Sequence, residues 1–476
     1  MRIASWNKFV ICLANEPELN IGITMTDKES KSSPSICIIG AGAAGLSAAY
    51  FLKEQGYKGV IVLEKESRVG GKCLSLTVYG KSFDLGANYI TSSYKHVMGL
   101  ARRFGATMYT EGKLNAYDHR SKEFSSLFKA VLKNSSLLKL GWLSLKYVYK
   151  RWRLNSIISD SKPGFKDISK YPDLCQPFGK WLLANGLEEL EALFRIPLSL
   201  MGYGQLQEIP AAYALTYMTN STFLDLALAA LNPEIRGYPK RFTEGYQRLW
   251  ERVSWEIEVK VGAEVTGVTR NDKIRIEYTI IEESLGNLTK TKRSLECDYL
   301  IIGTPLHYES VNGFLKDMTD EEKALFRKVS YDPFIVTTYI VPGSNDFFAA
   351  TFMVPEPTLY QPYVVTRQFE DNDLVSVYTR TRFGDPIRKD EILANNKEFF
   401  RSACGVDPGE YYTYSEFPYF PHVDAKEMAD KFYDRFEAMQ GRNNTYYVGG
   451  LLNFELVETI VNYSKALIDK NFARIK

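Results

Sequence analysis

The chain has 476 residues, of which 45% are apolar and 24% charged, and its formal net charge is +2. This composition is that of a globular protein with a substantial core, and the length suits two or three domains. The small net charge gives no general attraction to nucleic acid. Six cysteines occur without a C-x-x-C pair, and no two of the four histidines have metal-ligand spacing. We therefore expect no metal site and no disulfide framework, but a reducing, cytoplasmic compartment.

Residues 1–34 are predicted to be a flexible lead-in. The apolar run at 9–14 is short, and Glu16 and Glu18 follow it where a signal peptide would have a small, neutral cleavage region. A polar run over 26–35 then precedes the first strand. No apolar run approaches the roughly eighteen residues needed to span a bilayer.

Residues 36–47 organise the rest of the chain. The apolar run 36–39 leads into Gly40, Gly42 and Gly45, which have G-x-G-x-x-G spacing, and a helix is predicted over 44–55. A second apolar run, 59–63, closes on Glu64. This order of strand, glycine turn, helix, strand and acid is typical of a dinucleotide-binding unit.

Each part of this unit has a physical role. Gly40 allows the tight turn, Gly42 lets the backbone approach a pyrophosphate, and Gly45 lets the helix lie against the strand. The N–H groups at the helix start, Ala43 and Ala44, face the phosphates, and Glu64 lies at the spacing of an acid that binds a ribose hydroxyl pair. On its own the unit suits NAD as well as FAD.

Two later stretches decide between these dinucleotides. They are Glu64-Lys65-Glu66-Ser67-Arg68-Val69-Gly70-Gly71-Lys72 and Phe83-Asp84-Leu85-Gly86-Ala87-Asn88-Tyr89. With the glycine motif, they resemble the superfamily of flavin-containing amine oxidases, protoporphyrinogen oxidases and desaturases. The resemblance implies an α/β fold of two domains, in which a substrate domain of mixed sheet plus helices is interleaved with a Rossmann-like FAD-binding domain.

The resemblance also implies FAD as the cofactor. The first stretch would wrap the pyrophosphate and ribityl chain, and the second would run beside the isoalloxazine ring. A backbone group near Val265 would meet the adenine, and the start of the last helix would face the flavin pyrimidine. The implied cofactor-binding residues are Gly40, Gly42, Ala43, Ala44, Gly45, Glu64, Lys65, Arg68, Gly70, Gly71, Lys72, Gly86, Ala87, Asn88, Tyr89, Val265, Gly449, Gly450, Glu458, Thr459 and Ile460.

The predicted elements alternate between the two domains. The FAD-binding domain is expected to comprise 35–110, 241–309 and 413–476, and it includes a buried strand at 297–305, a strand at 445–450 and a final helix over 457–471. The substrate domain is expected to comprise a helical part, 111–240, and a sheet part, 310–412. The sheet is predicted to be mostly antiparallel, with strands at 334–341, 363–367 and 374–378.

The segment 124–159 contains no acidic residue, while lysines and arginines alternate with Leu, Trp and Tyr. The helical spacing of Leu138, Trp142 and Leu145 places apolar groups on one side and bases on the other. One interpretation is an amphipathic helix of the substrate domain with solvated lysines. The other is a peripheral membrane contact, which would suit a lipid substrate.

Rarer stretches narrow the resemblance to bacterial polyenoic fatty acid isomerases, which form conjugated linoleate. These stretches are 202–204, 209–213, 419–423, 439–445 and 462–465, and the resemblance runs from about Ser35 to Phe472. It implies hydride removal from a polyunsaturated fatty acid, or a similar apolar polyene, to flavin N5, followed by its return. No side chain is assigned as a catalytic residue. The candidate substrate-binding residues are Tyr203, Tyr213, Phe420, His422 and Lys113.

The alternative function is that of an FAD-dependent amine oxidase or dehydrogenase acting on an amine or secondary metabolite. Active flavin amine oxidases usually carry a lysine where this chain has Val336, which tells against that chemistry. Two stretches depart from the pattern of the isomerases and their superfamily. The stretch 112–117 lacks the arginine that would hold a fatty-acid carboxylate, and Gly449-Gly450 stands where the superfamily has Gly-Glu or Gly-Asp.

Overall fold

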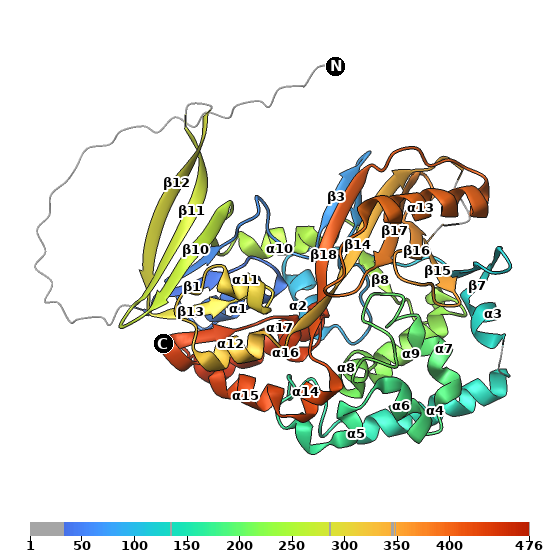
Figure 1. The fold of residues 1–476 in the computed structure, drawn as a ribbon, viewed down its shortest axis with the longest axis horizontal. Coiled ribbons are helices and arrows are strands. Elements are labelled where there is room, and N and C mark those ends of the chain that lie inside the picture. The colour runs from blue at the N-terminus through green and yellow to red at the C-terminus, as the bar shows by residue number, and fades with distance from the viewer. Residues whose placement is uncertain (1–32, 134–135, 285–286, 344–346, 348, 476) are drawn as a thin grey trace, which may run out of the picture. The chain divides into compact units, whose positions relative to one another are not determined.

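The computed structural model describes residues 33–475 apart from 134–135, 285–286, 344–346 and 348 (Figure 1). The predicted lead-in, 1–34, lies almost wholly outside the described residues.

A parallel five-stranded sheet assembles from distant parts of the chain. Its order is β19-β13-β1-β2-β9, and every neighbouring pair is parallel. The strands are β1 (Ile36–Ile39), β2 (Val60–Leu63), β9 (Glu258–Lys260), β13 (Tyr299–Ile302) and β19 (Thr445–Tyr447). Strand β1 is buried on both faces, as expected of an unbroken apolar run in a parallel sheet.

Helices cover this sheet. α1 (Ala43–Glu54) packs along α17 (Val457–Asn471), and α2 (Lys95–Arg103) and α10 (Tyr246–Ser254) lie beside them. An antiparallel sheet of β10 (Ala263–Arg270), β11 (Ile274–Ser284) and β12 (Asn287–Cys297) projects at the left of Figure 1. The predicted α/β fold with a Rossmann-like domain is confirmed, and the final helix occupies the predicted residues.

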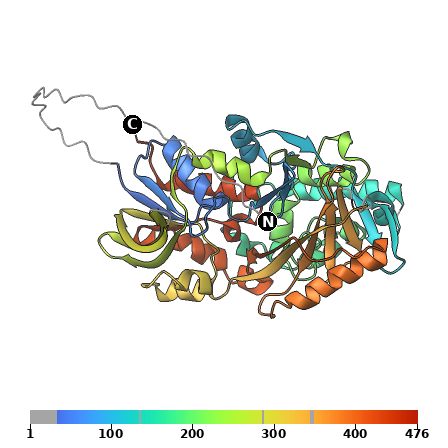
Figure 2. The same ribbon diagram turned by 90° about the horizontal axis from the view of Figure 1, so that it is seen from above.

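A second, seven-stranded sheet has the order β18-β14-β17-β16-β15-β6-β7. Its strands are β6 (Asn115–Asp118), β7 (Glu123–Ser126), β14 (Ser330–Ile340), β15 (Ala349–Val354), β16 (Pro362–Arg367), β17 (Leu374–Arg380) and β18 (Thr413–His422). Only β15 and β6 pair in parallel within this described sheet, so it is mixed, as expected. Seen from above, it lies with α13 (Lys389–Cys404) on the opposite side of the molecule from β10–β12 (Figure 2).

Helices of the substrate part lie below this mixed sheet in Figure 1. They include α4 (Leu137–Arg153), α6 (Phe178–Ala184), α7 (Glu191–Arg195), α8 (Ala211–Tyr217) and α9 (Asn220–Ala229). Within the predicted helical part, 111–240, α6 ends just before Gly186, which takes a φ of +58°. A 3₁₀ turn over Glu188–Leu190 then leads into α7.

Alternation along β14 separates two apolar clusters. Phe334 and Val336 point into a cluster with Tyr363 and Tyr378, whereas Tyr339 belongs to a cluster under α13. This is the period of two expected of a strand that is buried on both faces. The first cluster also contains Leu85, which joins the mixed sheet to the segment predicted to run beside the flavin.

Candidate dinucleotide site

The glycine turn after β1 is packed too closely for larger residues. Gly40 has a φ of +101°, and a Cβ there would lie 3.1 Å from the carbonyl oxygen of Gly303, just after β13. A Cβ on Gly45 would lie 1.9 Å from the carbonyl oxygen of Gly40. The turn, the first turn of α1 and the end of β13 therefore form one close-packed backbone assembly, as predicted for Gly40 and Gly45.

The start of α1 faces a second glycine-rich segment. Gly42 is the N-cap of α1 and supplies no side-chain cap, and the first turn, with Ala43 and Ala44, holds no acidic residue. The N–H of Gly70 donates to the carbonyl of Ala41 at 2.8 Å. A Cβ on Gly71 would lie 3.0 Å from the Cα of Gly42. The two segments thus form a backbone cradle at a helix N-terminus, which suits a pyrophosphate.

Glu64 lies at the end of β2, beside this cradle. Its Oε2 accepts the N–H of Ala41 at 2.7 Å, and its Oε1 accepts the N–H of Glu66 at 2.9 Å. The N–H of Ala263, at the start of β10, donates to the carbonyl of Glu64 at 2.7 Å, so the strand that contains Val265 begins here. Lys65 is exposed and points its ammonium toward Glu66 at 3.8 Å.

The segments around Arg68 and Gly86 are joined by main-chain contacts. Arg68 Nη2 donates to the carbonyl of Gly71 at 3.0 Å, so the guanidinium folds over its own loop. The N–H of Ala87 donates to the carbonyl of Lys72 at 3.1 Å. A Cβ on Gly86 would lie 1.7 Å from that same carbonyl oxygen, so the approach requires glycine.

The last glycine turn contains an acid that the sequence analysis missed. Gly449 has a φ of +144°, and a Cβ on Gly450 would lie 2.8 Å from the Cβ of Glu455. Glu455 is 9% exposed, and its carboxylate pairs with Lys72 and accepts the N–H of Phe420. The superfamily's usual acid directly after the glycine is absent, and Glu455 occupies the space beside that position. Because Glu455 lies five residues after Gly450, comparison with the superfamily's motif does not find it.

The expected residues at the start of α17 have partners of their own. The carboxylate of Glu458 accepts the N–H groups of His96 and Val97 at 2.9 Å each, so it caps α2. Thr459 Oγ1 donates to the carbonyl of Phe454 at 2.7 Å and caps the helix start, and the Ile460 N–H donates to the carbonyl of Leu456. Only main-chain N–H groups of this turn remain as ligands for a cofactor.

Three of the predicted substrate residues come together as an aromatic wall, which we define as Tyr203, Tyr213, Phe420 and Phe454. The ring centroids of Tyr203 lie 4.7 Å from Phe454 and 5.5 Å from Phe420, and those of Tyr213 and Phe420 are 5.5 Å apart. The Tyr203 hydroxyl donates to the Glu455 carbonyl at 3.2 Å, which connects the wall to the last glycine turn. Burial raises the pKa of the Tyr203 and Tyr213 hydroxyls, so both stay neutral.

The other two predicted substrate residues, His422 and Lys113, differ in their position relative to the aromatic wall. His422 stacks on the Phe420 ring at 4.7 Å and bonds through Nδ1 to the Phe420 carbonyl at 2.7 Å. Burial lowers the pKa of its imidazole, which favours the neutral form with Nδ1 as donor. Lys113 is exposed on the loop between β5 (Met108–Thr110) and β6. The structure therefore does not bring Lys113 to the aromatic wall.

A buried guanidinium lies beside Tyr89. Arg241, on β8 (Lys240–Phe242), is 1% exposed, and its Cζ lies 4.5 Å from the centroid of the Tyr89 ring. Its Nε pairs with Glu111, whereas Nη1 is buried and has no hydrogen-bond partner among the described residues. Sequence reasoning sought an arginine at 112–117 and missed this one, because the pairing of β5 with β8 brings it there from over one hundred residues away.

Asp84 and Asn88, in the segment predicted to run beside the flavin, contact the mixed sheet. The Asp84 carboxylate accepts the Ser75 hydroxyl at 2.6 Å and the Tyr246 N–H at 2.7 Å, and burial raises its pKa to about 6. Tyr378 donates its hydroxyl to the Asp84 carbonyl at 3.1 Å, and Asn88 lies within reach of the same hydroxyl. Val336, fully buried in the cluster with Tyr378, places an aliphatic group there instead of a lysine.

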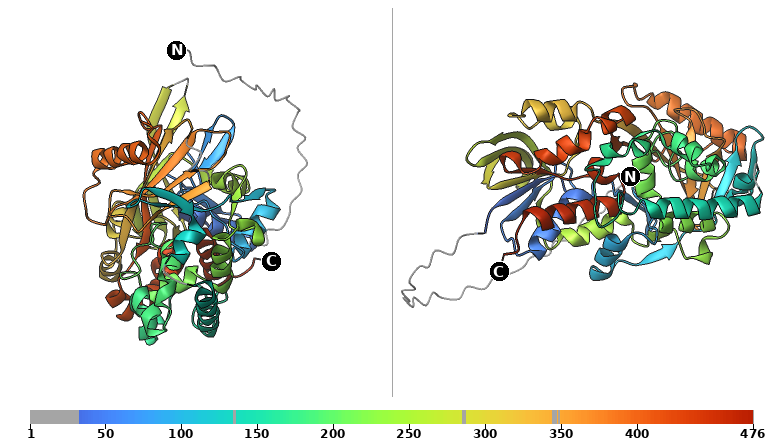
Figure 3. Two further views of the ribbon diagram at one scale, coloured as in Figure 1. Left: turned by 90° about the vertical axis from the view of Figure 1, so that its right-hand side faces the viewer. Right: turned by 90° about the horizontal axis from the view of Figure 1, so that it is seen from below.

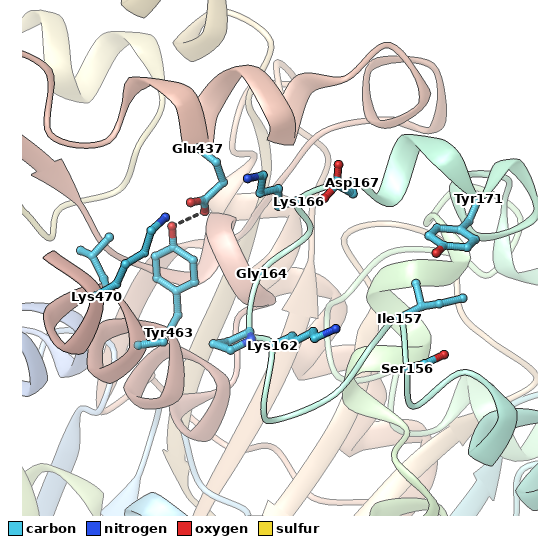
Figure 4. A pocket seen from close by; sticks show the side chains of 13 residues that line it. Ser156, Ile157, Lys162, Gly164, Lys166, Asp167, Tyr171, Glu437, Tyr463 and Lys470 are labelled. Atoms are coloured by element: carbon cyan, nitrogen blue, oxygen red, sulfur yellow. Dashed lines mark hydrogen bonds between the residues drawn. The ribbon is translucent and has the colours of Figure 1, made fainter.

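A separate open cavity of about 360 Å³ lies between the 156–171 segment and helices α15 (Phe432–Met439) and α17 (Figure 4). Tyr463 donates to Glu437 inside it, and burial raises the pKa of that carboxyl. Its lining residues are Ser156, Ile157, Lys162, Pro163, Gly164, Lys166, Asp167, Tyr171, Glu437, Tyr463, Ala466, Leu467 and Lys470. Since none of these is a predicted cofactor or substrate residue, the cavity is distinct from the cradle.

The cradle residues match a known family model. The model of an NAD(P)-binding Rossmann-like domain matches residues 38–104. A full-length relative, the FAD-dependent oxidoreductase dpchF of Colletotrichum higginsianum, is 23% identical over 88% of this chain and 89% of that protein. A probable polyamine oxidase 4 and a protoporphyrinogen oxidase 2 of Arabidopsis thaliana are 37% and 40% identical, over 22% and 16% of this chain.

Solved structures share the whole fold. The CLA-producing fatty acid isomerase from P. acnes superposes with a TM-score of 0.78 at 24% identity, covering 93% of this chain and 99% of that one. A putrescine oxidase variant superposes with a TM-score of 0.64 at 16% identity, covering 93% and 99%.

The fold and the cradle define a two-part protein, in which a Rossmann-like dinucleotide-binding unit is joined to a mixed sheet with helices. Residues 38–104 match an NAD(P)-binding Rossmann-like domain, and the fold of the chain is shared with the fatty acid isomerase and the putrescine oxidase. The resemblance noted in the sequence is thereby confirmed.

Proposed function

We propose that this protein is an FAD-dependent enzyme that isomerises a polyunsaturated fatty acid or a similar apolar polyene. The observation that carries the proposal is the aromatic wall joined through Glu455 to the last glycine turn, together with the aliphatic Val336. An apolar, uncharged wall beside the cofactor suits a hydrocarbon chain better than a cationic amine.

The residues present fit FAD. The cradle of Gly40–Gly45 and Gly70–Gly71 would hold the pyrophosphate, and Glu64 would stand beside the ribose. The buried hydroxyl of Thr304, next to Gly303, has no partner among the described residues and is a further donor at this turn. Lys72 and the 86–89 segment would line the ring. When bound, FAD supplies a hydride acceptor and donor at N5.

The chain's own contribution is then to orient the substrate and to exclude water. Tyr203, Phe420 and Phe454 would hold the unsaturated segment against the ring by packing, because their hydroxyl and main-chain polar groups are already paired. No side chain in the wall is placed as a nucleophile. A dry wall also protects the activated substrate from attack by water during the double-bond shift.

Arg241 is our candidate ligand for the substrate carboxylate. Its Nε satisfies Glu111, and the free Nη1 offers a donor beside Tyr89. A guanidinium can pair with Glu111 and a second carboxylate at once, whereas an ammonium is a single point charge. We expect Arg241→Lys to raise KM for linoleate about tenfold while kcat changes little. An unchanged KM, measured by initial rates, would remove Arg241 from this role.

The decisive test is anaerobic. Purified flavoprotein is mixed with linoleate, and absorbance is followed for conjugated diene and for flavin. Diene formation without lasting flavin bleaching supports the isomerase. Lasting bleaching by an amine or alcohol, reversed by air, would instead establish net oxidation. That alternative is favoured by the full-length relative named as an FAD-dependent oxidoreductase.

A further inference from the structure

Helix α4 presents several large apolar side chains to solvent. Five of them project from one stripe, because successive members are three or four residues apart and lie within a narrow arc of the helix. We call Leu138, Trp142, Leu145, Tyr149 and Trp152 the α4 stripe, and their exposed fractions are 88%, 68%, 66%, 53% and 61%.

The opposite side of α4 is fixed to the protein. Tyr147 is fully buried and donates its hydroxyl to the carbonyl of Met218 at 2.5 Å. Arg151 is 3% exposed and donates Nε to the carbonyl of Leu215 at 2.8 Å. These buried polar anchors would lose their partners if the helix rotated, so the stripe cannot turn inward.

Bases flank the stripe on one side. Lys139, Lys146, Lys150 and Arg153 follow the helical repeat next to it, and no acidic residue occurs over 124–159. Lys139 pairs with Glu189 at 2.5 Å, and Lys146 bonds the carbonyl of Gly186 at 3.1 Å. Leu183, on neighbouring α6, adds a further apolar side chain that is 66% exposed. The surface is thus apolar along its ridge and cationic along its edge.

The helix lies at the lower right of Figure 1, along the outer edge of the helical part, and the left view of Figure 3 again shows the teal helix at the edge of the molecule. Among the described residues, no helix is long and apolar enough to cross a membrane. An outward stripe with two tryptophans beside a row of bases is the pattern of a helix that lies in the interface of an anionic bilayer.

We infer that the α4 stripe docks this protein onto an anionic lipid bilayer. Leucine and tryptophan side chains enter the boundary between headgroups and acyl chains, while the flanking bases meet the phosphates. The row of bases on one side of the stripe favours a bilayer over a partner protein. A partner protein would need an acidic surface that matches this row, whereas an anionic bilayer presents negative charge over its whole surface. The inference rests on this surface and stands whether or not the proposed reaction is correct.

The test is flotation of the purified flavoprotein with vesicles of phosphatidylcholine, alone or mixed with phosphatidylglycerol. We expect binding to the mixed vesicles that weakens as salt is raised, because the basic edge is screened. Trp142→Ser combined with Trp152→Ser should reduce binding about tenfold or more. Trp255→Ser is the matched control, because Trp255 is also 68% exposed but lies at the end of α10.

Failure of the wild-type protein to float with mixed vesicles, or equal flotation of the double variant, would overturn the inference. Gel filtration without lipid supplies a second criterion. If the wild type is dimeric and the double variant monomeric, the stripe is an interface between two copies and the lipid inference is wrong. Circular dichroism of the double variant checks that its fold is intact, which these exposed positions lead us to expect.

Discussion

The dinucleotide cradle and the aromatic wall adjoin at the last glycine turn, yet they are built from different parts of the chain. In the cradle, main-chain atoms of Gly42 approach those of Gly71, and those of Gly45 approach those of Gly40. In the wall, large side chains of Tyr203, Phe420 and Phe454 fill the space. A backbone assembly tolerates no added Cβ, whereas a side-chain assembly tolerates replacement by a ring of similar shape. The predictions below test this difference.

The largest effect is expected in the cradle. Gly45→Ala places a methyl group where the Gly40 carbonyl lies 1.9 Å away, so the turn must open. We expect a loss of stability beyond about 4 kcal/mol and loss of bound flavin. Thermal unfolding and flavin absorbance of the purified protein measure the two.

The matched control is Gly99→Ala, in helix α2, where a Cβ would meet no atom within 4 Å. This change should be neutral or slightly stabilising, because alanine restricts the unfolded chain and favours helix. If Gly45→Ala behaved like Gly99→Ala, the close packing of the cradle would be disproved.

Two substitutions of Tyr203 should separate the contribution of its ring to stability from that of its hydroxyl. Tyr203→Ala removes a buried ring that contacts Phe420 and Phe454, and it should cost about 3 to 4 kcal/mol of unfolding free energy. Tyr203→Phe keeps the ring and loses only the bond to the Glu455 carbonyl, at about 1 kcal/mol. Both variants should retain flavin, as denaturant unfolding and absorbance can show. Equal losses in the two variants would mean that the hydroxyl, and not the ring, supports the wall.

A pH-dependent change is expected for Asp84→Asn, in the segment predicted to run beside the flavin. Because burial raises the Asp84 pKa from 3.8 to about 6, the folded state binds this proton more tightly than the unfolded chain. Its contribution is present below about pH 4 and is lost as pH rises through about 6, a change of about 3 kcal/mol. The asparagine variant should lack this decline, as unfolding measured from pH 4 to pH 7 can establish.

Asp298 is the opposite case and serves as the control. Its carboxylate pairs with Lys273 and Ser35, which lower its pKa from 3.8 to about 2. Asp298→Asn should therefore leave the pH dependence above about pH 4 unchanged. A decline in the Asp84→Asn variant as steep as in wild type would assign the titration to another group.

Several elements could be predicted because they depend on local chemistry. The apolar runs at 36–39 and 59–63 predicted the two strands of the dinucleotide-binding unit, and the strands predicted at 334–341, 363–367 and 374–378 correspond to β14, β16 and β17. The contacts that define the wall could not be predicted in this way. Tyr203, Phe420 and Phe454 meet across more than two hundred residues, and no local pattern reports that meeting.

The same limit applies to Arg241 and Glu455, whose roles depend on the pairing of β5 with β8 and on the path of the last turn. It applies equally to α4. The spacing of Leu138, Trp142 and Leu145 predicted an amphipathic helix, but it did not say which side faces the protein. The anchors Tyr147 and Arg151 decide that the apolar side faces outward.

By itself, the sequence determined the dinucleotide unit, since glycines at fixed spacing report a backbone path that other residues cannot follow. Only the tertiary structure decided which distant side chains surround that unit and which helix face stays exposed. The physical reason is that backbone constraints are local, whereas packing and ion pairing depend on segments brought together by the completed fold.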